Sequence, residues 1–171
     1  MLSRLDAPIG WSARGLALRN RNEGDRAFLR DLYGAFRADE MEPVPWPEPL
    51  KAQFLNEQFA LQTLHFDRFH ANADFLIVED RGLPIGRFYL DRKPDGFLVI
   101  DIGFLPHRQG GGLGAALLRH AHKRAAQRHA GRVWLHVSAT NHRAQQLYER
   151  LGFRVTEGAD ANYRTMEWEV S

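Results

Sequence analysis

The stretch that decides the fold is Asp101–Leu118, which reads DIGFLPHRQGGGLGAALL. The apolar run Phe97–Leu105 predicts a buried strand, and Pro106 suits its exit because proline lacks an N–H and fixes φ. Three glycines follow, and an amphipathic helix is predicted from about Leu113. Glycines at a strand-to-helix turn let successive backbone N–H groups face one ligand, and the helix N-terminus adds about half a positive charge. The stretch therefore predicts an anion site, and phosphate is the anion that we expect there.

Two common phosphate ligands fit this stretch poorly. No Lys follows the glycines, so the loop lacks the end of a Walker A motif and ATP or GTP is disfavoured. Gly110, Gly112 and Ala115 fit the loose dinucleotide pattern GxGxxG/A. The acidic residue that should follow about 20 positions later would fall near Leu135–Ser138, where the sequence reads LHVS. A nicotinamide-dependent oxidoreductase therefore stays the weaker alternative.

A second motif follows the next predicted strand and reads NHRAQQLYERLGFRV over Asn141–Val155. Together with QGGGLG at Gln109–Gly114, it resembles the two signature segments of the GNAT superfamily of N-acetyltransferases. The two segments occur in the expected order, with one helix and one strand between them. The resemblance covers Phe97–Phe153, about a third of the chain.

The elements predicted along the chain follow the order that this resemblance implies. Strands are predicted at Ala13–Arg19, Phe75–Glu79, Ile85–Asp91, Phe97–Leu105, Val133–Val137, Phe153–Glu157 and Tyr163–Val170. Helices are predicted after an N-cap at Asp25, over Leu50–Phe66, from about Leu113 and from Asn141, with the prolines of Met41–Pro49 excluding helix there. We expect a mixed α/β (α+β) fold of the GNAT type: a mostly antiparallel, twisted sheet of about seven strands flanked by four helices, in the order β-α-α-β-β-β-α-β-α-β-β.

Composition limits the remaining possibilities. A chain of 171 residues with 44% hydrophobic residues fits a single domain over residues 1–171. The absence of Cys excludes disulfides, thiolate metal sites and a cysteine nucleophile. No apolar run is long enough for a membrane span or a signal peptide, which favours a cytoplasmic protein. A net charge of +2 is too small to indicate nucleic acid, and the histidine spacing indicates no metal site.

The resemblance implies that acetyl-CoA is bound as a co-substrate. Its pyrophosphate would lie on the glycine loop, and its peptide-like arm would bond the backbone edge of the strand before that loop. A backbone N–H near Phe104 would polarise the thioester carbonyl. The residues implied to bind the cofactor are Ile102, Gly103, Phe104, Gln109, Gly110, Gly111, Gly112, Leu113, Gly114, Asn141, Ala144 and Tyr148. Asn141 is equally suited to cap the helix that it opens.

Tyr148 is also the implied general acid toward the departing CoA thiolate. Transfer of a proton from a tyrosine with a pKa of about 10 to a thiol of about 8.5 is uphill by roughly 2 kcal/mol. Tyr148 must therefore either have a lowered pKa or act mainly as a hydrogen-bond donor. The amine needs a base or a water chain, for which Asp101 and His136 are candidates and Glu40 is a weaker third.

The acceptor of the acetyl group is expected to bind against the first two helices. In the family, these helices form the acceptor wall, and here Tyr33, Phe36, Glu40 and Trp46 offer aromatic rings and a carboxylate that suit a cationic primary amine. The amine could belong to a small molecule or a peptide, and many superfamily members pair, which allows a homodimer. The rival interpretation is a non-catalytic acyl-CoA-binding or sensing module on the same fold.

Overall fold

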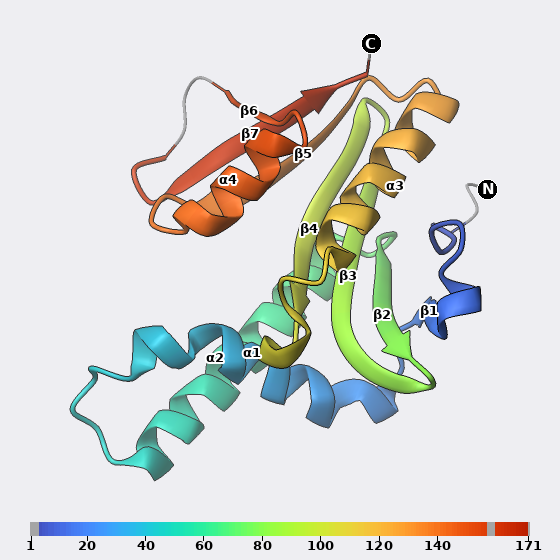
Figure 1. The fold of residues 1–171 in the computed structure, drawn as a ribbon. Coiled ribbons are helices and arrows are strands. Elements are labelled where there is room, and N and C mark those ends of the chain that lie inside the picture. Colours follow the sequence, from blue (N-terminus) through green and yellow to red (C-terminus); the bar gives the residue numbers. More distant parts are fainter. Residues whose placement is uncertain (1–3, 157–159, 171) are drawn as a thin grey trace.

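The computed structural model describes residues 4–156 and 160–170. Within these ranges, one seven-stranded sheet runs in the order β1-β2-β3-β4-β5-β7-β6 (Figure 1). All neighbouring strands are antiparallel except β4 and β5, which are parallel. The strands are β1 Leu16–Asn20, β2 Asp74–Asp80, β3 Leu83–Lys93, β4 Gly96–Phe104, β5 Arg132–Ser138, β6 Arg154–Val155 and β7 Tyr163–Glu169. The helices are α1 Arg26–Met41, α2 Glu48–Phe69, α3 Leu113–Gln127 and α4 His142–Arg150. The predicted fold class and element order are confirmed.

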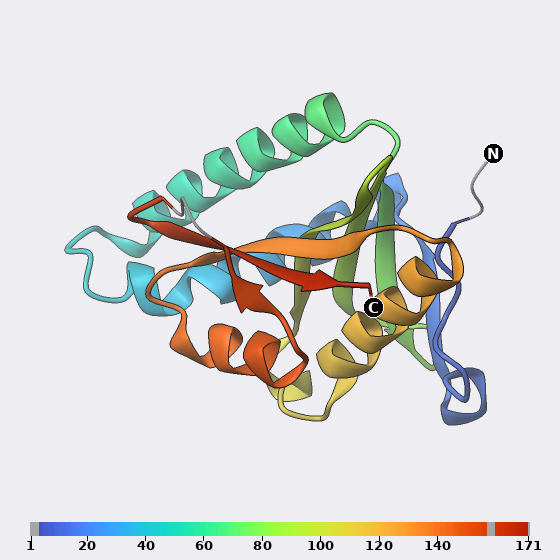
Figure 2. The same ribbon diagram turned by 90° about the horizontal axis from the view of Figure 1, so that it is seen from above.

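Helices cover both faces of the sheet. Figure 2 shows α2 on one side of the strands and α3 and α4 on the other. Because side chains alternate along a strand, each of the central strands contributes to both layers. In β3, for example, Phe88 and Leu90 join the large core, whereas Tyr89 meets Phe66 of α2 edge-on.

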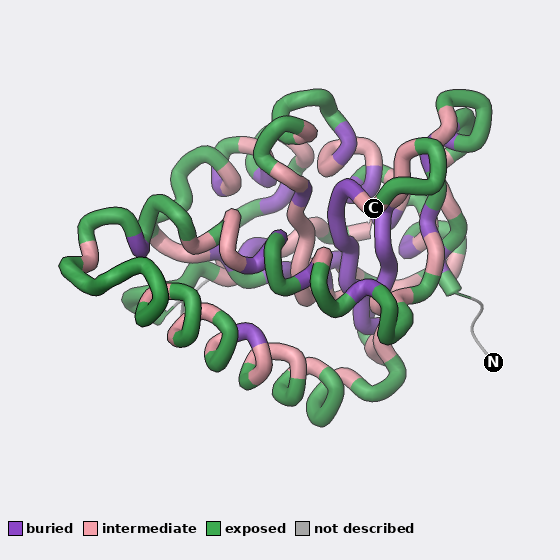
Figure 3. Tube along the Cα trace, turned by 90° about the horizontal axis from the view of Figure 1, so that it is seen from below, coloured by how far each residue is buried: buried purple, intermediate pink, exposed green. Residues whose placement is uncertain are grey.

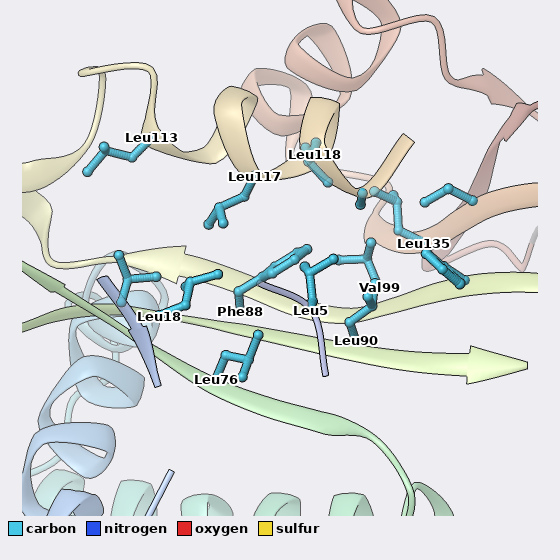
Figure 4. Close-up of a cluster of buried hydrophobic side chains, with 14 of the residues drawn as sticks. Leu5, Leu18, Leu76, Phe88, Leu90, Val99, Leu113, Leu117, Leu118 and Leu135 are labelled. Carbon is cyan, nitrogen blue, oxygen red and sulfur yellow. The ribbon is translucent and has the colours of Figure 1, made fainter. Parts of the chain in front are cut away.

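The large hydrophobic core lies between α3 and the sheet. Leu117 and Leu118 of α3 are fully buried and pack over Phe88 and Val99 (Figure 4). The helical spacing of the apolar residues in α3 explains this packing, because positions three and four apart share one helix face. The core therefore fixes the start of α3, and with it the glycine loop, against the end of β4.

A smaller core lies on the opposite face, where α1 and α2 meet the sheet. Tyr33 of α1 packs against Phe59 of α2 with 5.9 Å between ring centroids, and Leu29 and Ile77 complete the cluster. This packing anchors the inner side of both helices to β2.

Two expectations about the N-terminal region are wrong. The predicted strand Ala13–Arg19 begins as a short 3-10 helix, Ser12–Arg14, and β1 starts only at Leu16, because Gly15 reverses the chain with φ +76°. Asp25 precedes α1 but makes no side-chain cap there. Its carboxylate instead pairs with Arg19 at 2.7 Å and closes a capping box with Asn22 around the preceding 3-10 turn.

The boundaries near the prolines and at the C-terminus also differ from prediction. Helix α2 begins at Glu48, inside the segment from which helix was excluded, because Pro49 lies in the first turn, where its missing N–H costs no hydrogen bond. Strand β6 is only Arg154–Val155, and Glu157 of the predicted strand lies outside the described residues. Strand β7 ends at Glu169, one residue before the predicted end.

The sheet opens between its two parallel strands. Pairing of β4 with β5 runs from Gly96 opposite Arg132 to Val99 opposite Leu135 and stops there. Ile100 is the extra residue of a β-bulge, since Val99 pairs with Leu90 and Asp101 with Tyr89. A bulge bends and twists its strand. The second half of β4 therefore leaves β5 while staying paired with β3.

Two glycine substitutions test this packing in opposite directions. A Cβ on Gly86 would lie 2.5 Å from Phe104 Cδ1 and 2.6 Å from the Gly103 carbonyl oxygen, so Gly86→Ala is expected to cost about 1–3 kcal/mol of unfolding free energy. Gly34 lies within α1 with no atom within 4 Å of an added Cβ, so Gly34→Ala is expected to stabilise by about 0.5–1 kcal/mol. Thermal denaturation measures both. Equal melting temperatures for the two variants would contradict the close approach of β3 and β4.

Candidate functional site

A cleft of about 1360 Å³ occupies the opening between β4 and β5. Its walls come from α1, the second half of β4, the glycine loop, the start of α3, the end of β5 and α4. From Asp101 to Phe104, β4 pairs only with β3, so the backbone groups on its other edge face the cleft. An unpaired strand edge of this kind offers alternating N–H and C=O groups to an extended, amide-containing ligand.

The glycine loop closes one end of the cleft with a helix N-terminus. Gly112 is the N-cap of α3 at φ +81°, and no side chain caps this helix. The first N–H groups of an α-helix have no acceptor within the helix, so those of α3 remain available to a ligand. Gln109 donates a hydrogen bond from Nε2 to the Phe104 carbonyl at 3.1 Å, which ties the loop to the end of β4. The loop thus has the helix N-terminus on which the anion site was predicted, and the binding of an anion there stays a prediction.

The charged side chains of the cleft are separated by sign. Arg119 of α3 and Arg143 and Arg150 of α4 line it, and among the residues that the structure describes none of the three has a carboxylate within 4.0 Å. At the α1 and β4 side, the lining carries the carboxylates of Asp39 and Asp101. The cleft thus presents positive charge along α3 and α4 and negative charge along α1 and β4.

Tyr148 of α4 lies on the cleft wall with 9% of its surface exposed. Burial raises the pKa of its phenol to about 12, and the charge of Asp101 contributes in the same direction. Of the two alternatives for this residue, the lowered pKa is therefore wrong. Tyr148 stays protonated at neutral pH and is available as a hydrogen-bond donor within the cleft.

Asp101 is held by a buried arginine that sequence reasoning missed. Arg87 of β3 is 2% exposed; its Nε donates to Asp101 Oδ2, and its Nη2 donates to Gln62 of α2 at 3.1 Å. Burial by itself lowers the pKa of Arg87, but the charge of Asp101 and the hydrogen bond to it raise the pKa above the ordinary value. The signal was available, because an Arg inside the apolar run of β3 needs a buried partner.

His136, the other candidate base, lies across the opening on β5. Its ring is exposed, lines the cleft, and shares a hydrogen bond between Nδ1 and Thr165 Oγ1 at 3.0 Å. Because Asp101 and His136 stand on the two separated strands, an amine bound between the strands could be reached from either side.

Asn141 and Ala144 form the start of α4. Asn141 lines the cleft, and its Oδ1 accepts a hydrogen bond from the Ala144 N–H at 3.1 Å. The prediction that Asn141 caps the helix is therefore confirmed. Ala144 also lines the cleft. Of the residues predicted to bind cofactor, Gly111 alone is absent from the described lining, and the other eleven are brought together there.

The residues predicted to bind the acceptor are not all gathered at the cleft. Phe36 lines it and packs against Gly103, where an added Cβ would overlap the Phe36 ring. The Tyr33 ring is buried in the smaller core, and Glu40 is exposed and paired with Arg37 at 2.6 Å. Trp46 is 41% exposed and contacts Phe54 of α2. These three lie outside the cleft lining that the structure describes.

The described ranges hold neither a membrane-spanning helix nor a cluster of metal ligands. No helix there is long and apolar enough to cross a membrane. No three His, Asp or Glu side chains there lie close enough together to hold a metal ion, and the expectation of a metal-free reaction stays a prediction.

The fold, the uncapped glycine loop and the opening between β4 and β5 define one class of protein. The model of the acetyltransferase (GNAT) family matches residues 21–153, more than three quarters of the chain. The chain belongs to this family.

Among individual relatives, the mycothiol acetyltransferase of Streptomyces coelicolor is 31% identical over 96% of this chain and 50% of its own length. That of Streptomyces griseus is 33% identical over 74% of this chain and 34% of its own length. This chain therefore spans between a third and a half of those proteins.

Solved structures share the fold at lower sequence identity. The PaiA N-acetyltransferase of Thermoplasma acidophilum, in complex with coenzyme A, superposes with a TM-score of 0.69 at 17% identity, over 90% of this chain and 98% of that one. The spermidine N-acetyltransferase of Vibrio cholerae, in complex with CoA and spermine, gives 0.61 at 22% identity, over 91% of this chain and 96% of that one.

Proposed function

We propose that this chain transfers the acetyl group of acetyl-CoA to a primary amine by direct attack in a ternary complex. The observation that carries the proposal is the single cleft that joins an uncapped helix N-terminus, an unpaired strand edge and the Tyr148 hydroxyl. Each of these three features suits a different part of the acetyl-CoA molecule. Membership of the acetyltransferase family supports the same activity.

The residues of the cleft fit coenzyme A. The pyrophosphate would accept hydrogen bonds from the free N–H groups at the start of α3, where Gly112 leaves open space for it. Arg143 lies beside this site, since its Nη2 is 3.8 Å from where a Cβ on Gly110 would be. The amide groups of the pantetheine arm would pair with the edge of β4 between Asp101 and Phe104, as an added strand does.

The protein side chains then have distinct tasks in the transfer. The amine nitrogen forms a bond to the thioester carbon, while the Phe104 N–H stabilises the charge on the carbonyl oxygen. The carbon–sulfur bond breaks, and Tyr148 donates a hydrogen bond to the leaving sulfur. The proton lost by the amine goes to Asp101, to His136 or to water. Both residues line the cleft, so their positions favour neither one over the other.

The acceptor is proposed to be a cationic primary amine. Asp39 of α1 and Asp101 of β4 carry negative charge on the cleft wall, and the ring of Phe36, which also lines the cleft, packs against Gly103 of β4. A carboxylate pair and an aromatic ring attract an ammonium group through charge and cation–π contacts. Both small and peptide amines suit such a site, and the spermine complex of the Vibrio relative is an example of the former.

A thermal-shift titration with acetyl-CoA tests the proposal, with NADH and ATP alongside. At 100 times its Kd, a ligand adds about 2.7 kcal/mol, which is roughly a 5–10 °C rise for a domain of this size. A rise with acetyl-CoA alone, followed by CoA release with at least one member of an amine panel, is the expected result. A rise without CoA release from any amine would favour the non-catalytic acyl-CoA-binding module. A rise with NADH alone would overturn the proposal.

A further inference from the structure

The side chain of Arg87 is a buried charge in the middle of the sheet. It is 2% exposed, and Figure 3 shows the middle strands largely buried, with α2 along the margin of the molecule. A guanidinium is stable in such a place only where charged or hydrogen-bonding partners compensate for the loss of water. Among the described residues, Asp101 is the one carboxylate within 4.0 Å of Arg87. Asp101 is therefore the counter-ion on which this buried charge depends.

Arg87 and Asp101 are diagonal neighbours on the face of the sheet that meets α2. Arg87 pairs with Gly103 of β4, and Asp101 lies two residues before Gly103 on the same face. Because Gly103 has no side chain, the ring of Phe36 packs against it. The guanidinium carbon of Arg87 lies 5.6 Å from the centroid of that ring and 5.0 Å from the centroid of Tyr89. The carboxylate and the two rings together restrict the orientation of the guanidinium.

Gln62 of α2 holds a second edge of the same guanidinium. Its Oε1 accepts a hydrogen bond from Arg87 Nη2 at 3.1 Å, while Arg87 Nε donates to Asp101 Oδ2. Nε and Nη2 belong to one planar, rigid group, so an acceptor that fixes Nη2 also fixes the direction of the Nε–H bond. Gln62 is half-buried and lies outside the cleft lining that the structure describes. The line of contacts from Gln62 to the cleft runs through Arg87 and Asp101.

Arg87 binds one of the two carboxylate oxygens of Asp101. Within the described residues, the other oxygen, Oδ1, accepts no hydrogen bond. The Asp101 side chain is 27% exposed and lines the cleft, where its charge contributes to the raised pKa of Tyr148. An attacking amine gains positive charge as its bond to the thioester carbon forms, and a fixed carboxylate oxygen beside it stabilises that charge. Oδ1 of Asp101 is suited to this contact.

We propose that Arg87 and Gln62 are positioning residues, which hold Asp101 with Oδ1 directed at the acceptor amine. The inference rests on the proposed acetyl transfer and extends its machinery from β4 through β3 to α2. Gln62 fixes the direction of Arg87, and Arg87 fixes the direction of Asp101. The arrangement serves Asp101 both as a base for the amine and as an acceptor for one of its N–H groups. Misplacement of a reacting group by about 1 Å lowers a rate by as much as about a hundredfold, so the loss of one contact is measurable.

Gln62→Leu removes the outermost contact and keeps a side chain of similar size. It is expected to lower kcat/KM for the amine about tenfold and to leave the Kd for acetyl-CoA unchanged. The matched control is Gln58→Leu, because Gln58 lies four residues earlier on α2, is also half-buried and makes no hydrogen bond within the described residues. Its kcat/KM should equal that of the original chain. Steady-state kinetics with the best amine of the panel and calorimetry with acetyl-CoA measure these quantities.

A second set of variants tests whether Gln62 acts through the ion pair. Arg87→Gln/Asp101→Asn removes both charges together, so neither is left buried without its partner. We expect this pair of substitutions to lower kcat/KM for the amine about a hundredfold. Adding Gln62→Leu to the pair is expected to cause no further loss, because the contact that Gln62 makes is already gone. Circular dichroism checks the fold, and if the pair does not fold, the comparison of Gln62→Leu with Gln58→Leu decides alone.

Three results would overturn the inference while leaving the proposed function intact. The first is an equal kcat/KM in Gln62→Leu and Gln58→Leu. The second is the same loss again when Gln62→Leu is added to the neutral pair, since a merely structural effect adds to the others. The third is a parallel rise in the Kd for acetyl-CoA. An original chain that binds acetyl-CoA but releases no CoA with any amine would overturn the proposed function and this inference together.

Discussion

Replacing Gly112 by aspartate is expected to raise the Kd for acetyl-CoA at least a hundredfold. The new carboxylate would stand at the uncapped N-terminus of α3, where the pyrophosphate is proposed to bind. Two negative charges about 4 Å apart repel each other by roughly 1 kcal/mol in water and about 4 kcal/mol near a protein surface. A hundredfold change corresponds to about 2.7 kcal/mol, which lies inside that range.

The chain supplies a matched control for this substitution. Gly10 has φ +84° against +81° for Gly112, and neither glycine has an atom within 4 Å of an added Cβ. Gly10→Asp therefore introduces the same charge under the same backbone strain, but away from the described cleft lining. Isothermal titration calorimetry should find weak binding in Gly112→Asp alone. Unchanged affinity for acetyl-CoA in Gly112→Asp would contradict the proposal that the pyrophosphate binds at the glycine loop.

The second large effect is expected for Tyr148→Phe, which should lower kcat about a hundredfold with little change in the Kd for acetyl-CoA. With a pKa of about 12, Tyr148 is a weaker acid than a thiol of about 8.5 by about 3.5 units, or roughly 5 kcal/mol. Complete proton transfer to the departing sulfur is therefore unfavourable. A hydrogen bond that strengthens as charge develops remains favourable, and the loss of one such donor typically costs a factor of 10² to 10³.

Steady-state kinetics with one chosen amine measures the change in kcat, and calorimetry measures the change in the Kd for acetyl-CoA. Tyr163→Phe on β7 removes a hydroxyl from an exposed tyrosine outside the described cleft lining and should leave both quantities unchanged. If Tyr148→Phe turned over as fast as the original chain, Tyr148 would be a packing residue of the large core, to which its ring already contributes. The high pKa also means that no loss of activity below about pH 11 should arise from ionisation of Tyr148.

Much of the fold was predictable because its signals are local. The glycine loop and the apolar runs of the strands each depend on only a few neighbouring residues, and their order along the chain predicted the order of the elements in the sheet. The wrong boundaries have local causes that the sequence leaves ambiguous. Pro49 is compatible with either a break or a first helical turn, and the structure uses the latter.

Parts of the site depend on contacts between distant residues, which a single sequence does not reveal. The pairing of Arg87 with Asp101 and Gln62 joins three elements across 14 and 25 positions of sequence. The separation of acidic from basic side chains along the cleft could not be predicted, because it depends on where the helices lie in three dimensions. Tyr33 is a residue whose sequence signal was ambiguous. Its helical spacing fits both a substrate-binding wall and a core, and the structure buries its side chain in the smaller core.

The opening between β4 and β5 also has a mechanical consequence. The sheet is continuous across β1, β2, β3 and β4 and across β5, β7 and β6, but these two blocks share only the four residue pairs between Gly96–Val99 and their partners on β5. Eight pairs join β3 to β4 and seven join β5 to β7, so the seam between the blocks is held by fewer residue pairs than the strands on either side of it. Because residues of both blocks line the cleft, we expect a long ligand in the opening to contact both of them and to reduce the motion of the C-terminal block relative to the rest of the sheet.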